Sequence, residues 1–357
     1  MEPMTRRNAL SVLAGAAASV ASMPLFAAAP GLRPKRTGIG MHSYGFHWRA
    51  AKEDPASAKF SDAFEFLKYA HQIGAGGVQV NMGAKDSAYA HRIKSFAEEH
   101  EMYFEAQFTL PKDEADLSRF ETDVRLAREA GATVFRTACL SGRRYETFKS
   151  AEEFREFRER SWKSLALAEP ILKKQRLHVA VENHKDWLIP ELLEILRRLG
   201  SEWVGVCIDT GNSIALLEDA IEVVEGFAPF VWSTHIKDMG VLECADGFLL
   251  SEVPLGDGFL PLKRIVETLR KAKPAVQFNL EMITRDPLRI PCLTGNYWAT
   301  MEKTPASRLA GALATVKQNS SSKPLPKTTG LTLDQQLAFE DGNVRQSLVY
   351  AREQLGL

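Results

Sequence analysis

Four apolar runs in the second half of the chain each end at a residue that can ligate a metal. The first three end residues follow one another after 27 positions (182 to 209) and 26 positions (209 to 235), about the length of one strand, one helix and two turns. The last step, 46 positions (235 to 281), has room for the same unit and a long loop. The runs span residues 177–181, 204–208, 230–234 and 276–280, and they end at Glu182, Asp209, His235 and Glu281.

Within each run the side chains alternate between two faces, as they do along a strand. The face shared with the terminal ligand is mostly small or polar, with His178, Ala180, Gly205, Cys207, Val231, Ser233, Gln277 and Asn279. The opposite face is mostly bulky and apolar, with Val179, Val181, Val206, Ile208, Trp232, Thr234, Phe278 and Leu280. This pattern is typical of a parallel barrel with helices outside and catalytic residues at the carboxyl ends of its strands. Buried strands that end in polar turn residues by chance are the alternative, and four such ligands in succession disfavour it.

The same rhythm begins at residue 37. It predicts strands over residues 38–44, 77–81, 103–108 and 133–138, with Arg136 a candidate for pointing inward. It predicts helices over residues 62–73, 88–100, 117–130, 152–173, 190–199, 214–227 and 262–271, and an eighth over 306–316. Residues 239–258 are expected to form a long loop. We therefore predict a (β/α)8 TIM barrel over residues 37–317, a linker over 318–330, and a C-terminal helical extension over 331–357 that packs on the barrel or on a second subunit of a homo-oligomer.

The first 29 residues have the pattern of an export signal. Arg6 and Arg7 precede an alanine-rich run over residues 9–29, and Ala27–Ala29 offer a small-residue cleavage site. The paired arginines resemble a twin-arginine signal; an ordinary Sec signal and a disordered tail are the alternatives. We expect a periplasmic or otherwise exported protein, with no stable membrane insertion after cleavage because no other long apolar segment follows.

Composition narrows the range of partners. The 357 residues are 45% hydrophobic, and 45 basic residues balance 45 acidic ones. A formal charge of zero argues against a nucleic-acid binder. The four cysteines form no CxxC pair; Cys244 and Cys292 fall in predicted loops, where a disulfide and two free thiols are both open.

Two glutamates, an aspartate and an imidazole together make a hard, anionic site. Such a site favours one divalent ion, Mn²⁺ first, with Mg²⁺ or Co²⁺ as alternatives. A metal chelated by two sugar oxygens polarises a carbonyl and stabilises an enediolate. Glu182 and Glu281, one on each face of the sugar, are the candidate bases that take a proton and return it.

Several motifs carry a family resemblance. The segments Glu182-Asn183-His184, Asp209-Thr210-Gly211-Asn212, His235-Ile236-Lys237-Asp238, Pro254–Gly258 and Leu280-Glu281 resemble the xylose-isomerase-like sugar isomerase/epimerase superfamily over about residues 37–317. The resemblance implies that Glu182, Asp209, His235 and Glu281 bind one Mn²⁺-type ion and that both glutamates move the proton. It also implies that His184 and Lys237 contact substrate oxygens. Asn212 and His42 are further candidate substrate contacts at the barrel mouth.

The sequence departs from the abasic-site endonucleases of that superfamily. Those enzymes hold three zinc ions and need a histidine where this chain has Asn212, and an Asp-x-His after the seventh strand, where residues 239–258 contain no histidine. The nuclease interpretation is therefore rejected. Ketose 3-epimerases also often carry histidine at the position of Asn212, which weighs against a simple ketose 3-epimerase.

The leading functional prediction is a divalent-metal-dependent isomerase or epimerase that acts through an enediolate on a non-phosphorylated keto-sugar or sugar acid. One alternative is a lyase or decarboxylase on an oxo sugar acid or a 3-keto-glycoside, and another is a non-catalytic sugar-binding barrel. Segments 247–256 and 281–287 resemble an exported subgroup, some of whose members act on oxidised or branched-chain sugars. Arg285, in the loop after the eighth strand, is the candidate to bind a substrate carboxylate; pairing with its neighbour Asp286 or capping of the loop is the alternative.

Overall fold

The computed structural model describes residues 37–357, except 84, 302 and 322–323. The predicted export signal lies outside these residues and stays a prediction. Among the described helices none is both long enough and apolar enough to cross a bilayer.

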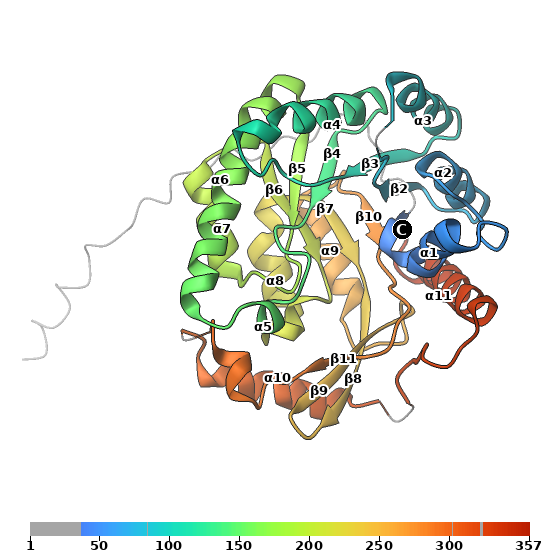
Figure 1. Ribbon diagram of the computed structural model, residues 1–357. Coiled ribbons are helices and arrows are strands. Elements are labelled where there is room, and N and C mark those ends of the chain that lie inside the picture. The colour runs from blue at the N-terminus through green and yellow to red at the C-terminus, as the bar shows by residue number, and fades with distance from the viewer. Residues whose placement is uncertain (1–36, 84, 302, 322–323) are drawn as a thin grey trace, which may run out of the picture. The chain divides into compact units, whose positions relative to one another are not determined.

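Eight parallel strands close into a barrel, which confirms the predicted (β/α)8 TIM barrel (Figure 1). Closure is made by β1, which pairs with both β2 and β10. The strands are β1 (Gly38–Gly40), β2 (Gly77–Val80), β3 (Tyr103–Gln107), β4 (Val134–Thr137), β5 (His178–Glu182), β6 (Val204–Asp209), β7 (Val231–Ile236) and β10 (Phe278–Leu280). The four predicted ligands lie at or directly after the carboxyl ends of β5, β6, β7 and β10, so they share one end of the barrel.

Helices alternate with the strands and cover the barrel from outside (Figure 1). They are α1 (Gly45–Glu53), α2 (Ala63–Gln72), α3 (Ser87–Glu99), α4 (Leu117–Glu129), α5 (Arg144–Thr147), α6 (Ala151–Gln175), α7 (Ile189–Leu199), α8 (Ala220–Phe227) and α9 (Leu262–Ala272). The side chains of Asp62, Asp86, Ser150 and Asp219 accept hydrogen bonds from first-turn amides and fix where four of these helices begin.

Two predicted elements are shorter than expected. The first strand ends at Gly40 rather than Tyr44, because the chain turns into a 3₁₀ helix (Met41–Tyr44), where the Ser43 hydroxyl donates to the carbonyl of Leu280. The predicted helix over 214–227 is divided into a 3₁₀ turn (Ser213–Leu216) and α8. Leu217 stands between them with φ +64°, a left-handed conformation that ends the first turn.

The predicted long loop over 239–258 is wrong: most of it is a β-hairpin. β8 (Asp238–Cys244) and β9 (Gly247–Val253) pair antiparallel, and β11 (Leu288–Ile290) adds a third strand beside β9. Val241, Phe248 and Leu250 are fully buried in this small sheet. The hairpin carries β9 residues back toward the barrel mouth, where Glu252 becomes part of the site.

The helix that packs outside the eighth barrel strand, β10, is not the predicted one. α10 (Ala306–Asn319) packs on β8 of the small sheet, whereas α11 (Leu333–Gln354) lies against α1 and β10 (Figure 1). A carboxylate fastens α11 in place: Glu340 accepts hydrogen bonds from the backbone N–H groups of Phe46 and His47 and from Nδ1 of His47. Residues 333–354 therefore fill the outer position next to β10 that the sequence analysis assigned to residues 306–316.

One strand breaks the predicted alternation of faces. Between β6 and β7 the register shifts, so that Val206 pairs with Val231 and Cys207 pairs with Ser233. The extra residue, Trp232, packs against the inward cluster of Ala180 and Cys207 instead of facing the helices, and Val231 joins the outer core. The bulge restores the predicted parity from Ser233 onward, which leaves His235 pointing into the barrel.

Candidate metal centre

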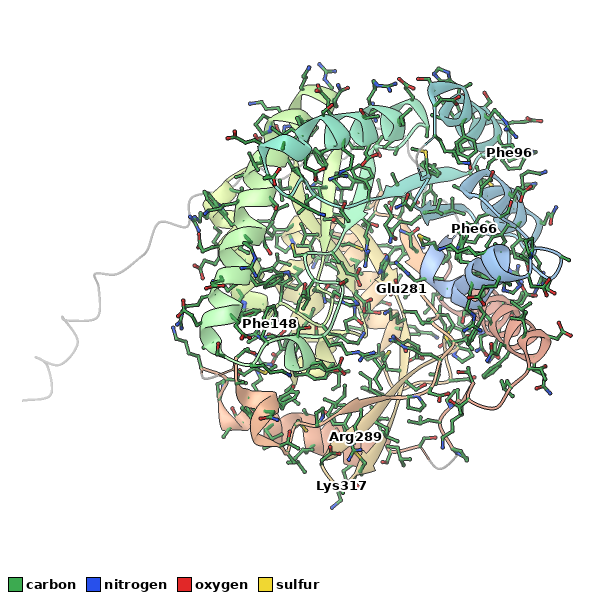
Figure 2. The ribbon with its side chains drawn as sticks, in the orientation of Figure 1. Phe66, Phe96, Phe148, Glu281, Arg289 and Lys317 are labelled. Atoms are coloured by element: carbon green, nitrogen blue, oxygen red, sulfur yellow. The ribbon has the colours of Figure 1, made fainter. Side chains whose placement is uncertain are left out.

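Glu182, Asp209, His235 and Glu281 come together at the carboxyl end of the barrel. One ligand atom from each lies within 4.8 Å of all the others. Nδ1 of His235 is 3.5 Å from Glu182, 3.7 Å from Asp209 and 3.4 Å from Glu281. All four residues are almost fully buried, and Glu281 lies near the middle of the barrel (Figure 2).

A hydrogen-bonded relay inside the barrel orients the imidazole. Oε1 of Gln79 lies 2.7 Å from Nε2 of His235, while Nε2 of Gln79 donates to Glu105 at 2.9 Å and to Ser233 at 3.1 Å. Because Glu105 and Ser233 take the amide N–H groups, the Gln79 oxygen faces the ring and accepts its Nε2 proton. Nδ1, which has no hydrogen-bond partner among the described residues, faces the carboxylates and is the ring nitrogen left for a metal ion.

Motif residues that are not ligands tie the strand ends together. Asn183 accepts from the backbone N–H of Asp209 at 2.8 Å and donates to its carbonyl at 3.0 Å. The Thr210 hydroxyl does the same for Lys237, at 2.9 and 3.2 Å. These paired contacts fix β6 against β5 and β7 at the level of the ligands.

Neighbouring groups fix the carboxylates of Asp209 and Glu182. Oδ1 of Asp209 accepts from the backbone N–H of Gly211 and Asn212. Glu182 forms an ion pair with Arg136 and accepts from the Asn212 amide at 3.0 Å. The predicted inward direction of Arg136 is thus confirmed.

Lys237 is the central cation of the site. Its Nζ lies 2.6 Å from Glu281, 2.9 Å from Asp209 and 3.8 Å from Glu252. Burial lowers the pKa of Lys237, but Asp209 and Glu281 outweigh burial and hold that pKa above its ordinary value. Lys237 therefore stays charged and bridges two ligands.

The pKa values of two ligands are shifted by the charges around them. Burial raises the pKa of the Glu281 carboxyl, yet His235 and Lys237 hold it well below its ordinary value. Burial lowers the pKa of the His235 imidazole, yet Cys207, Glu281 and Asp209 hold it well above its ordinary value. Carboxylates that are ionised and pull a proton onto an imidazole form a donor set suited to a hard divalent cation.

The described residues fit one ion and no more. No second group of three or more histidine, cysteine, aspartate or glutamate ligands occurs within residues 37–357, gaps aside. Asn212 stands where the endonucleases carry a metal-binding histidine, and its side chain is engaged by Glu182, Lys185 and Lys237. The expectation of a single-metal site is therefore consistent with the geometry.

The predicted substrate contacts lie around this centre. His42 is half-buried and lies 2.8 Å from the amide nitrogen of Gln107; burial lowers its pKa to about 4. His184 is also half-buried, and burial and Lys185 hold its pKa well below the ordinary value. Nδ1 of His184 has no hydrogen-bond partner among the described residues. Neither His42 nor His184 forms an ion pair with a described residue, so both imidazoles can contact a ligand.

Arg285 does not pair with Asp286. Its guanidinium forms a two-pronged ion pair with Glu252 of β9, whereas Asp286 accepts hydrogen bonds from Thr328 and Thr329. The predicted contact of Arg285 with a substrate carboxylate stays a prediction, but the guanidinium already has a carboxylate partner from the chain itself.

Sequence reasoning missed four residues of the site. They are Gln79, Glu105, Lys185 and Glu252, and the sequence analysis gave none of them a role in the site. A polar residue on the inner face of β2 or β3 is the only signal that would have found the first two. The other two arrive from a loop and from the hairpin, whose position depends on contacts distant in the sequence.

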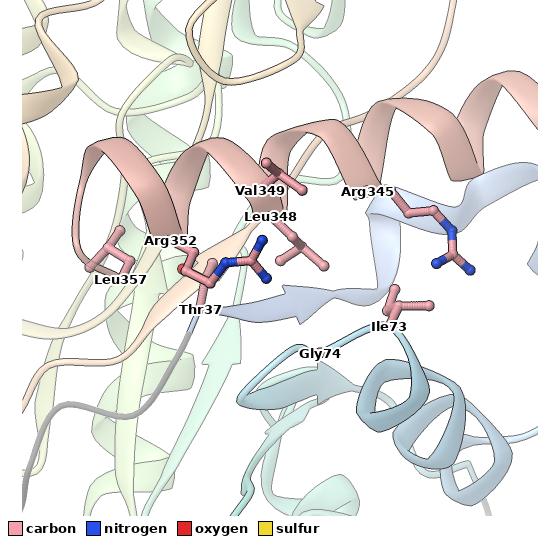
Figure 3. Close-up of a pocket in the computed structure, with 8 residues that line it drawn as sticks. All are labelled: Thr37, Ile73, Gly74, Arg345, Leu348, Val349, Arg352 and Leu357. Atoms are coloured by element: carbon pink, nitrogen blue, oxygen red, sulfur yellow. The ribbon is translucent and has the colours of Figure 1, made fainter.

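A separate cavity lies away from the metal centre. It has a volume of about 270 Å³ and is lined by Thr37, Ile73, Gly74, Arg345, Leu348, Val349, Arg352 and Leu357 (Figure 3). Thr37 precedes β1 and Gly74 precedes β2, so this cavity opens at the amino end of the strands, opposite the ligands. Active sites of such barrels lie at the carboxyl end, and we assign this cavity no catalytic part.

Comparison with known proteins decides the family. Residues 67–304, more than half of the chain, match the family model described as xylose isomerase-like TIM barrel. The chain belongs to the xylose isomerase-like TIM barrel family. A curated relative is the 3-oxo-isoapionate decarboxylase of Pectobacterium atrosepticum, which is 24% identical over 65% of this chain and 80% of the relative.

Solved structures support the same fold. A D-psicose 3-epimerase matches with a TM-score of 0.56 at 15% identity, over 90% of this chain and all of that one. A xylose isomerase-like TIM barrel protein from Mycobacterium smegmatis, in complex with magnesium, matches with a TM-score of 0.53 at 14% identity, over 78% of this chain and 98% of that one. At these identities the likeness establishes the xylose isomerase-like fold. It does not transfer a substrate.

The cysteines are all free, including Cys244 and Cys292. Cys207, in β6, is buried beside the ligands as the sequence indicated.

Proposed function

We propose that this member of the xylose isomerase-like family is a divalent-metal-dependent enzyme that isomerises or epimerises a carbonyl-bearing, non-phosphorylated carbohydrate. The observation that carries the proposal is the convergence of three carboxylates on the unpaired Nδ1 of His235. A bound divalent ion, with Mn²⁺ the first choice, would supply a Lewis acid that polarises the substrate carbonyl.

The chain's own residues account for the proton transfers. Glu182 comes from β5 and Glu281 from the end of β10, two strands that are separated by β6 and β7 in the barrel. One glutamate, as the carboxylate, removes the proton beside the carbonyl. The other, which enters the step as the carboxylic acid, delivers its proton to the opposite face of the same carbon and inverts it. Lys237 keeps Glu281 ionised, so it is ready to act as a base. His42, His184, Lys237 and Asn212 are the proposed contacts to substrate oxygens.

Decarboxylation of an oxo sugar acid is the second candidate. The similarity to 3-oxo-isoapionate decarboxylase favours it. In that reaction the C–C bond electrons move toward the carbonyl as CO₂ leaves, and only one glutamate is needed, to protonate the carbon. A non-catalytic barrel is disfavoured, because sugar binding alone does not require a buried carboxylate on both sides of the site.

A panel of keto-sugars and oxo sugar acids in D₂O tests the proposal. The metal-loaded protein should place deuterium on the carbon beside the carbonyl of one panel member and keep its carbon count. Chelation should stop the exchange, and Mn²⁺ should restore it. Release of CO₂ would instead establish the decarboxylase. Turnover that survives complete chelation would overturn the metal-dependent proposal.

A further inference from the structure

Lys185 is a buried cation without an anionic partner. It is 2% exposed and lies three residues beyond Glu182, in the loop after β5. Its Nζ contacts Oδ1 of Asn212, an uncharged acceptor. Among the described residues no carboxylate lies within ion-pair distance of this ammonium group, although Arg136, Lys237 and Arg285 each have one. A buried charge that lacks a partner is costly, so this one requires an explanation.

The surroundings of Lys185 add to the imbalance. Lys237 reaches the same Asn212 oxygen at 3.3 Å, so two ammonium groups share one neutral acceptor. Burial and Lys237 lower the pKa of Lys185 to about 7. The energetic cost that this shift reflects would be relieved by an anion placed beside Nζ.

The charge balance of the whole centre points in the same direction. Four buried carboxylates face four cations: Glu182, Asp209, Glu252 and Glu281 against Arg136, Lys185, Lys237 and Arg285. With Lys185 charged and the His235 imidazole neutral, as a metal ligand must be, these residues sum to about zero. A divalent ion at the four ligands raises the sum to about +2, and a neutral sugar would leave that charge buried and uncompensated.

We propose that Lys185 binds a carboxylate of the substrate, so that the substrate is a carbonyl-bearing sugar acid and not a neutral keto-sugar. This inference rests on the proposed function, because it names the substrate class of the same site. Asn212 holds the ammonium group in place, and the carboxylate completes its contacts. The role predicted for Arg285 passes to Lys185, since Glu252 already occupies the Arg285 guanidinium.

Binding of two unreactive probes tests the inference without turnover. D-Gluconate and D-glucitol have the same six-carbon polyol chain and differ in a terminal carboxylate or hydroxymethyl group. Calorimetry on the Mn²⁺-loaded protein should give at least about tenfold tighter binding of gluconate. In Lys185→Met, gluconate affinity should fall about tenfold to a hundredfold, as expected for a charge-assisted contact, while glucitol affinity stays within about twofold. Lys185→Arg should retain most of the preference.

Exposed Lys112 provides the matched control. Lys112→Met should leave both affinities unchanged, and metal content and the thermal midpoint of each variant show that the site is intact. Equal binding of gluconate and glucitol by the wild-type protein would overturn the inference whether or not Lys185→Met folds. So would unchanged gluconate affinity, or equal weakening of both probes, in Lys185→Met. Failure of the proposed function would appear separately, as absent metal-dependent deuterium exchange with gluconate binding preserved.

Discussion

Nε2 of His235 lies 2.7 Å from Oε1 of Gln79, and this contact leaves Nδ1 of the ring to the three carboxylates. Gln79 cannot turn its amide around without losing its donations to Glu105 and Ser233. The tautomer of the central histidine is therefore set by Gln79 and by the two residues, Glu105 and Ser233, that hold its amide in one orientation.

Loss of the Gln79 oxygen should weaken metal binding. Gln79→Met keeps a side chain of similar length but offers no acceptor to Nε2, so the imidazole is no longer held in one tautomer. We expect Mn²⁺ affinity to fall by about tenfold to a hundredfold, the usual cost of such a contact. Calorimetric titration with Mn²⁺ measures it. Gln107→Met is the control: Gln107 contacts His42 at the mouth and no ligand, and its substitution should leave Mn²⁺ affinity within about twofold.

Replacing either glutamate by glutamine should keep a metal ligand but remove a base. Glu281→Gln keeps an oxygen for the metal but cannot accept a proton, so we expect weakened metal binding, an intact fold and loss of turnover. Glu182→Gln should also abolish inversion. Deuterium exchange at saturating Mn²⁺ separates lost chemistry from lost metal. Near-full rates in both variants would refute a mechanism with two bases.

The seam between α11 and the barrel depends on one carboxylate. Glu340→Ala leaves the backbone N–H groups of Phe46 and His47 without their acceptor in a buried position. We expect unfolding in urea to show a loss of about 2–4 kcal/mol. Glu353→Ala, at an exposed position of the same helix, should change stability by less than about 0.5 kcal/mol. Equal effects of the two substitutions would mean that α11 does not depend on this contact.

Asp186 predicts a pH dependence of stability. Burial raises the pKa of this carboxyl from 3.8 to about 8. Since the folded-state pKa lies above the unfolded one, folding favours the protonated form. Its contribution is complete below about pH 4 and is lost as pH rises to about 8, by about 1.4 kcal/mol for each pH unit in between.

Asp186→Asn should remove this dependence. The difference in unfolding free energy between Asp186→Asn and wild type should shift in favour of the variant between pH 5 and pH 8. Asp334→Asn, which changes an exposed carboxyl, should show no such shift. A constant difference for Asp186→Asn across that range would show that the carboxyl is ionised in the folded protein.

The four ligands could be found from the sequence because each one ends a strand, and strand ends in a parallel barrel share one side. Ser233 and Asn279 point into the barrel as predicted, because each lies two positions before a ligand on the same strand. It failed for Trp232, since a one-residue bulge shifts the register and leaves no mark in the alternation.

Other features required contacts between distant segments. The β8–β9 hairpin directly follows the ligand His235 at the end of β7. A loop is expected there in a barrel, so the apolar pattern of the hairpin was interpreted as a loop. α11 replaced the predicted eighth helix because Glu340 matches the first-turn amides of α1, almost 300 positions earlier in the chain. Lys185 and Glu252 are buried, charged residues beside the ligands, and no spacing in the sequence predicts that they lie there.

Metal content is the most direct test of the central claim, a single divalent centre at Glu182, Asp209, His235 and Glu281. Wild-type protein loaded with Mn²⁺ and dialysed should retain about one ion per chain by elemental analysis. His235→Ala, treated in the same way, should retain less than about a tenth, with its fold intact by circular dichroism. Three ions per wild-type chain, no retained ion, or equal retention by His235→Ala would contradict the account.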